Sequence, residues 1–213
     1  MKINKYILGF CAIGLMTLSC TDLQEEVLDG VELKSAAGEY AVNNEDPAPL
    51  LKAAYLSHGF LQTTNTALGM TEMTTDALAG PTRGGDWDDN GIWRSLHNHS
   101  WDADHDFLGS TFSELLQIVF ATSNLQQFNP SPQTKAEARF IRAYVVSSVL
   151  DGWGQVPYRQ DGSSLLEDAD VLDAQGAIDL IMTELNAIEG DLPASPVNRA
   201  NKDAAKMLKM RML

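Results

Sequence analysis

TKAEARFIRAYVVSSVLDGWGQVPY, residues 134–158, is the stretch that decides the fold of this 213-residue chain. Thr134 and Glu137 have the spacing of a capping box and predict the start of a helix. Small and apolar side chains then recur at helical spacing and predict one buried stripe: Ala136, Phe140, Ala143, Tyr144, Ser147 and Leu150. The Asp-Gly-Trp-Gly run at 151–154 predicts a sharp end to this helix.

A second helix is predicted immediately before this stretch. Apolar residues between 108 and 128 fit the same 3.6-residue period: Leu108, Phe112, Leu115, Leu116, Val119 and Phe120. Ser110 or Asp106 is the expected cap, and the Asn-Pro-Ser-Pro run at 129–132 stops the helix. Because the connection has only about four or five residues, the two helices are expected to pack antiparallel as a hairpin.

Further helices are predicted on both sides of this hairpin. Asp46 and Pro47 suit the start of a helix whose apolar face holds Leu50, Leu51, Ala54, Tyr55 and Leu61. Asp173 is expected to cap a helix with the core positions Ile178, Ile181, Leu185 and Ile188.

Asn201 is expected to cap a short last helix with Ala205, Leu208 and Met212 on one side. A helix of about a dozen residues is marginal alone, so its apolar face is expected to need a partner outside this chain. The sequence therefore suggests a truncated form of a longer protein.

The first 19 residues have the pattern of an export signal. Lys2 and Lys5 give a basic start, and residues 6–18 form an uncharged, mostly apolar run that is shorter than the about 20 residues of a membrane-spanning helix. The run ends in Thr-Leu-Ser before Cys20, which resembles a bacterial lipobox and predicts acylation of Cys20. Residues 20–45 are polar and acidic and are interpreted as a tether; a plain secretory signal is the alternative.

Charge and cysteine content exclude several classes of function. Cys11 lies in the predicted leader and Cys20 would be lipidated, so disulfide and thiol chemistry are excluded from the body of the protein. The formal net charge of −14 disfavours nucleic acid as a partner, since phosphates would be repelled. Anionic lipid would be repelled too, and attachment to a membrane is expected to depend on acyl chains.

The stretch PTRGGDWDDNGIWRSLHNHSW, residues 81–101, is predicted to be a polar, aromatic loop that serves as a recognition surface. It contains Trp87, Trp93 and Trp101, three of the four tryptophans of the chain. A tryptophan can cover about 150 to 250 Å² of apolar surface, which suits the apolar face of a pyranose ring. Core packing is the alternative for Trp87 and Trp93, and it is the favoured interpretation of Trp153.

Hydrogen-bonding partners for sugar hydroxyls are expected on both sides of these tryptophans. The candidates are Asp76, Arg83 and Asn98. With Trp87, Trp93 and Trp101 they form the predicted ligand-binding set.

Metal binding and catalysis are weaker alternatives for the same region. Residues 86–91 match the first half of a calcium loop, but Arg94 and His97 replace ligands in its second half. Zinc could use His97, His99 and His105, yet no pattern supplies the remaining ligands. No G-x-S-x-G elbow, P-loop or H-E-x-x-H motif is present, so we predict no enzyme activity and no metal or other cofactor.

Three segments together resemble the SusD/RagB family of glycan-binding surface lipoproteins of the Bacteroidota. The strongest is A-E-A-R-F-[IL]-R-A followed eight residues later by G-W-G-x-V-P, within residues 134–158. The lipobox-like start is the second. TTDALAGPTRGGDW at 74–87, with LHNHSW downstream, is the third and resembles the starch-binding branch of that family.

The resemblance implies an all-α fold of tetratricopeptide-like helical hairpins with long loops, which covers residues 46–213 here and is incomplete. It implies a lipid-anchored protein of the cell outer membrane that captures oligo- or polysaccharide and passes it, uncleaved, to a SusC-like TonB-dependent transporter. Asp76 and Arg83 resemble polar contacts of the family, and Trp93, Asn98 or Trp101 resemble its aromatic and amide contacts. A helical protein-interaction module without glycan binding is the alternative function.

Overall fold

The computed structural model describes residues 46–60, 66–81, 85, 87–163, 165–166 and 168–213. They belong to the second of the two units of the chain, residues 33–213. The predicted signal peptide (1–19), Cys20 and the tether (20–45) lie outside the described residues. Within the described ranges, no helix combines the length and apolar character needed to cross a bilayer.

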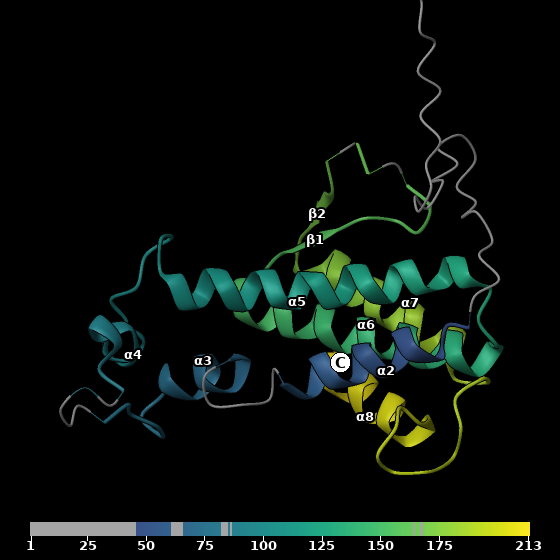
Figure 1. Ribbon diagram of the computed structural model, residues 1–213, viewed down its shortest axis with the longest axis horizontal. Coiled ribbons are helices and arrows are strands. Elements are labelled where there is room, and N and C mark those ends of the chain that lie inside the picture. The colour runs from purple at the N-terminus through teal and green to yellow at the C-terminus, as the bar shows by residue number, and fades with distance from the viewer. Residues whose placement is uncertain (1–45, 61–65, 82–84, 86, 164, 167) are drawn as a thin grey trace, which may run out of the picture. The chain divides into compact units, whose positions relative to one another are not determined.

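The fold is all-α, as predicted, with one small two-stranded ribbon that the sequence did not predict (Figure 1). The helices are α2 (Ala48–Phe60), α3 (Ala67–Met73), α4 (Ile92–His97), α5 (Asp106–Asn124), α6 (Pro132–Trp153), α7 (Ala174–Ile188) and α8 (Lys202–Met212), with the 3-10 turns η1 (Asp89–Gly91) and η2 (Leu125–Phe128). The ribbon pairs β1 (Val156–Tyr158) with β2 (Asp170–Leu172) in antiparallel register. The short connection between α5 and α6 confirms the predicted hairpin.

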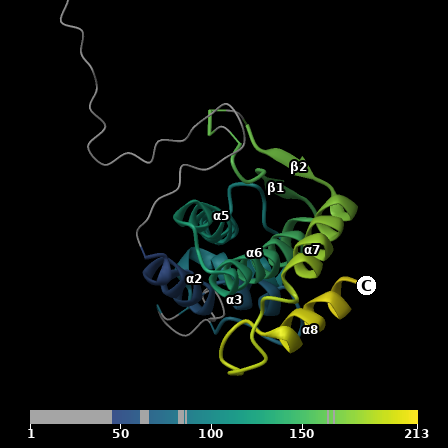
Figure 2. The same ribbon diagram turned by 90° about the vertical axis from the view of Figure 1, so that its right-hand side faces the viewer.

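Helix α6 is the centre of the helical array. It packs against α2, α5 and α7, which surround it in the view of Figure 2. The prediction of a single buried stripe is therefore wrong, because positions outside that stripe, among them Ile141, Val145 and Val149, are also buried. Neighbouring helices cover more of the circumference of α6 than an amphipathic surface helix would present to a core.

The caps that start α5 and α6 differ from those predicted. The Ser131 hydroxyl accepts from the backbone N–H of Thr134 at 3.2 Å, so α6 begins at Pro132 and the predicted Thr134–Glu137 capping box is wrong. Helix α5 is capped by His105, whose Nδ1 accepts from the N–H of Leu108 at 3.3 Å. A histidine cap was missed because the residues usually preferred at this position are Ser, Thr, Asp and Asn.

The end of α6 follows the prediction. Gly154 adopts a left-handed conformation, with φ of 72°, and donates its N–H to the carbonyl of Leu150 at 2.8 Å. Glycine suits this position because a side chain would strain it. The chain then turns directly into β1.

The predicted caps of the last two helices are confirmed. Asp173 accepts from the N–H of Gly176 at 2.8 Å, and Asn201 accepts from the N–H of Ala204 at 2.8 Å. Ala205 and Leu208 of α8 are buried in the main core, where α8 packs against α7. The expectation that this apolar face needs a partner outside the chain is thus wrong, since α7 covers it.

Three charged residues of α6 hold the array together from inside. Arg142 is 1% exposed; its guanidinium donates to Glu184 of α7 at 2.7 Å and to Ser123 of α5 at 2.9 Å, and it also pairs with Asp161. Arg139 binds the same Glu184 through two hydrogen bonds of 2.9 Å. Glu184 thus joins both arginines of α6 to α7.

These contacts shift the protonation equilibria of both partners. Burial acts to lower the pKa of Arg142, but the carboxylates of Asp161 and Glu184 outweigh it and raise that pKa above its usual value. Burial likewise acts to raise the pKa of Glu184, whereas its bonds to Arg139 and Arg142 hold that pKa below its usual value. Both groups are therefore charged in the folded protein at neutral pH.

The third charged residue, Glu137, is fully buried and joins α6 to segments far away in the sequence. Arg199 donates to its two carboxylate oxygens at 2.8 and 2.9 Å, and the Tyr55 hydroxyl of α2 donates to it at 2.6 Å. The Tyr55 oxygen in turn accepts from the N–H of Ala200 at 2.9 Å. The helix α2 is thereby linked to the segment that leads into α8.

Replacing Tyr55 by phenylalanine is expected to change how stability depends on alkaline pH. Burial and the bond to the Glu137 carboxylate raise the pKa of Tyr55 from 10.0 to about 12. Because the folded pKa is the higher one, this contribution is complete below pH 10 and is lost as the pH rises towards 12. Urea unfolding between pH 8 and 11.5 should show a steeper loss for the natural protein than for Tyr55→Phe. Tyr144→Phe is the control, and equal slopes in Tyr55→Phe and the natural protein would contradict the expectation.

Candidate functional site

The described part of the predicted recognition loop, residues 81–101, is mostly helical and is not one long loop. Its described part contains η1 and α4, with Gly91 in a left-handed conformation (φ 87°) at the junction. Trp93 lies on α4 and is only 7% exposed. It belongs to a second hydrophobic cluster whose other buried members are Met70, Met73, Leu96 and Phe107.

The surroundings of Trp93 show how completely it is enclosed. The rings of Trp87 and Phe107 lie 5.1 and 4.8 Å from its own, centroid to centroid, and its Nε1 donates to Asp89 at 2.6 Å. Gly80 approaches so closely that a Cβ there would lie 2.8 Å from the Trp93 Cβ. Trp93 thus has no open face for a ligand, and of its two sequence interpretations the structure supports core packing. Trp87 is half-buried against it.

Trp101 is placed differently, because it follows α4 and is 40% exposed. It lines a groove of about 760 Å³ between α3, the start of α5 and the end of α6. Figure 1 shows α3 and α4 beside the N-terminal end of α5. This groove is the candidate functional site.

A second tryptophan lines the same groove. Trp153, the last residue of α6, is half-buried and packs its ring against Phe112 at 5.0 Å. The sequence favoured core packing for Trp153; it does pack against the core, and it also faces the groove. The Gly-Trp-Gly pattern alone does not distinguish these roles, since only the fold brings residues 101 and 153 to one groove.

Apart from the indole N–H groups of Trp101 and Trp153, the polar side chains that line the groove carry hydroxyls and carboxylates. Thr71 donates its hydroxyl proton to backbone carbonyls of α3, at 3.0 Å for Leu68, and Thr74 donates to the Thr71 carbonyl at 2.9 Å. Asp102 accepts from the N–H of Asp104 at 3.1 Å. The fourth polar side chain of the lining, that of Asp151, pairs with Arg211, and both side chains are largely exposed.

The remaining predicted contacts lie beside the groove or outside the described residues. Asp76 and Asn98 are exposed and do not line the groove. They are, however, neighbours in sequence of Thr74 and His99, which are joined by a bond of 2.8 Å between the His99 Nε2 and the Thr74 carbonyl. Arg83 lies outside the described residues.

The described residues contain no group of three histidine, cysteine or acidic side chains able to hold a metal ion. Asp88, from the calcium-like segment, pairs with Arg94 at 2.7 Å. His105 binds the Ser95 hydroxyl at 2.8 Å as well as capping α5. These side chains therefore have structural partners.

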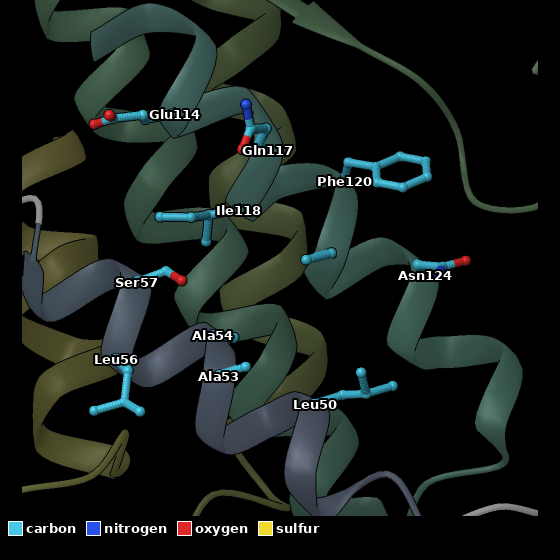
Figure 3. A pocket seen from close by; sticks show the side chains of 11 residues that line it. Leu50, Ala53, Ala54, Leu56, Ser57, Glu114, Gln117, Ile118, Phe120 and Asn124 are labelled. Carbon is cyan, nitrogen blue, oxygen red and sulfur yellow. The ribbon is translucent and has the colours of Figure 1, made fainter. Parts of the chain in front are cut away.

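A second hollow, of about 640 Å³, lies between α2 and α5 and is mostly apolar (Figure 3). Leu56 and Phe120 are the most exposed of its large side chains, at 66% and 53%. A smaller hollow of about 200 Å³ on the other side of α5 also reaches Phe120. Phe120 is the one aromatic residue among the described residues that line these two hollows, whereas Trp101, Phe112 and Trp153 line the groove. The groove therefore offers more aromatic surface to a sugar ring.

Comparison with solved structures identifies the fold. Similar structures include surface glycan-binding protein A from Bacteroides fluxus, at 24% identity and a TM-score of 0.55, over 78% of this chain and 38% of that one. A SusD-like protein from Bacteroides fragilis matches at 15% identity and a TM-score of 0.60, over 78% of this chain and 34% of that one. A SusD-like carbohydrate binding protein from the same species matches at 19% identity and a TM-score of 0.52, over 72% of this chain and 37% of that one.

The chain has a SusD-like, all-α fold, and the predicted fold class is confirmed. It spans between 34% and 38% of the length of those three structures. No protein-family model and no curated protein matches the chain.

Proposed function

We propose that this protein captures glycans without cleaving them, in the groove lined by Trp101 and Trp153. The observation that carries the proposal is the convergence of the exposed indole ring of Trp101 and the half-buried ring of Trp153 with hydroxyl and carboxylate acceptors in one groove. Indole faces cover the apolar faces of sugar rings, and oxygen acceptors bind their hydroxyls. Asp76, Arg83 and Asn98 are proposed as additional contacts at the rim, whereas Trp93 acts through packing.

The fold supports a carbohydrate-binding role of this kind. The names of two of the similar structures describe a surface glycan-binding and a carbohydrate binding protein. We extend the proposal to a protein anchored in the outer membrane through acylated Cys20, which delivers its glycan to a TonB-dependent transporter. A starch-like glucan is the first ligand to test, because of the resemblance of residues 74–87 to the starch-binding branch.

Replacing Trp101 by alanine is expected to weaken glycan binding by about tenfold or more, as for a buried aromatic contact at a binding hot spot. The purified chain is titrated with a glycan panel that begins with maltoheptaose, while tryptophan fluorescence and newly released reducing ends are followed. We expect a fluorescence change without cleavage.

Phe120→Ala is the matched control, because Phe120 is an exposed aromatic outside the groove. It should bind as the natural protein does. Release of reducing ends would show an enzyme instead. The absence of any response in a folded sample would reject glycan capture and leave the protein-interaction module as the alternative.

A further inference from the structure

The polar groups that line the Trp101 groove suit a neutral or cationic ligand better than an anionic one. We infer that the groove selects uncharged or amino-substituted glycans and rejects glycans that carry carboxylates or sulfates. This inference rests on the proposed function and adds the charge class of the ligand to it.

The first argument is the direction of the hydrogen bonds. Thr71 and Thr74 have already given their hydroxyl protons to backbone carbonyls, so both present lone pairs to the groove. Asp102 and Asp151 can only accept while they are ionised. These four side chains therefore need hydrogen-bond donors, which sugar hydroxyls, amides and ammonium groups supply and a carboxylate or sulfate does not. The donors among the lining side chains are the uncharged indole N–H groups of Trp101 and Trp153.

The second argument is the net charge of the segment that supplies most of the groove. Residues 66–124, which supply two of its three walls, contain nine acidic and two basic residues, a net charge of −7 out of −14 for the whole chain. Of the two basic residues, Arg94 pairs with Asp88, and Arg83 lies outside the described residues. Asp102, Asp104 and Asp106 follow Trp101 directly.

The third wall of the groove, at the end of α6, contains the carboxylate of Asp151. Asp151 is paired with Arg211 of α8, so that cation is already engaged with an acid of the groove. Among the described residues that line the groove there is no lysine or arginine. An anionic ligand would thus meet carboxylates before it met an unengaged cation.

The test compares glycans that share a backbone and differ in charge. The probes are maltoheptaose, cellohexaose and mannohexaose, each with its C6-oxidised uronate counterpart, and chitohexaose with its deacetylated, cationic counterpart. We expect each oxidised form to bind at least about tenfold more weakly than its neutral parent at low salt. The difference should shrink in about 0.5 M salt, where charges are screened, whereas a steric exclusion would persist.

Asp102→Asn should narrow the difference between neutral and oxidised forms, because it removes a charge next to Trp101. Asp179→Asn is the matched control: it removes the same charge from the exposed surface of α7, outside the groove, and should leave the difference unchanged. An oxidised glycan that binds as well as its parent, or better, overturns the charge inference and leaves glycan capture intact. If no glycan binds, the proposed function fails and the inference fails with it.

A second measurement does not depend on the identity of the glycan. Quenching of tryptophan fluorescence by caesium and by iodide is compared between the natural protein and Trp101→Phe, which isolates the contribution of Trp101. We expect caesium to quench Trp101 more strongly than iodide, and Asp102→Asn to shift the ratio towards iodide. Stronger quenching of Trp101 by iodide would contradict the inferred negative potential.

Discussion

Replacing Arg142 by methionine is expected to lower the free energy of unfolding by about 3 to 5 kcal/mol, the cost of breaking a buried ion pair from one side. Arg142 is 1% exposed, and its loss leaves Glu184 with one cationic partner and Asp161 with none of its bonds to α6. Methionine fills much of the volume, so the effect reports on charge and hydrogen bonding. Urea unfolding followed by circular dichroism measures it.

The matched comparison is Arg139→Met, which removes a cation from the same Glu184 but from a more exposed position, 20% against 2% for the side chains. Its cost should be clearly smaller. Adding Glu184→Met to Arg142→Met should cost less than the sum of the single changes, because both substitutions break the same Arg142–Glu184 bond. A loss below about 1 kcal/mol for Arg142→Met would show that the network contributes little to stability.

Replacing Trp93 by alanine is expected to cost a similar amount, about 3 to 5 kcal/mol, as for other buried aromatic residues. Trp93 is 7% exposed and packs between Trp87 and Phe107, so a cavity would remain. The corresponding Trp101→Ala substitution should cost about 1 kcal/mol or less, because Trp101 is 40% exposed.

The substitutions Trp93→Ala and Trp101→Ala distinguish a tryptophan that packs in the core from one that binds the ligand. Trp93→Ala should destabilise α3 and α4 and impair binding only through that loss, whereas Trp101→Ala should impair binding in a protein of nearly natural stability. Thermal unfolding and glycan titration of both variants measure this. Equal stability losses in the two variants would contradict the division of roles.

Much of the helical framework could be predicted from local sequence. Side-chain caps such as Asp173 and Asn201 act within three residues, so their positions determine where α7 and α8 begin. The proline-containing connection between α5 and α6 likewise restricts the chain locally and predicts a hairpin. Such features depend on neighbours in sequence and need no knowledge of the tertiary fold.

Features that depend on distant partners could not be predicted in this way. Glu137 and Arg142 interrupt an apolar pattern, and only the positions of Arg199 and Glu184 explain why charges are buried there. Trp93 and Trp101 are only eight residues apart, but one lies on α4 facing the second cluster and the other follows that helix. The groove itself joins residues from α3, α5 and α6, so no single segment contained its pattern.

The bonds of Tyr55 to Glu137 and to Ala200 have a consequence for how the protein opens. Stacked helical hairpins contact only their neighbours, and such arrays usually begin to unfold from their ends. Here the N–H of residue 200 bonds to a hydroxyl 145 positions earlier in the chain. The helix α2 and the entrance to α8 should therefore lose their amide protection together in hydrogen exchange, and not one after the other.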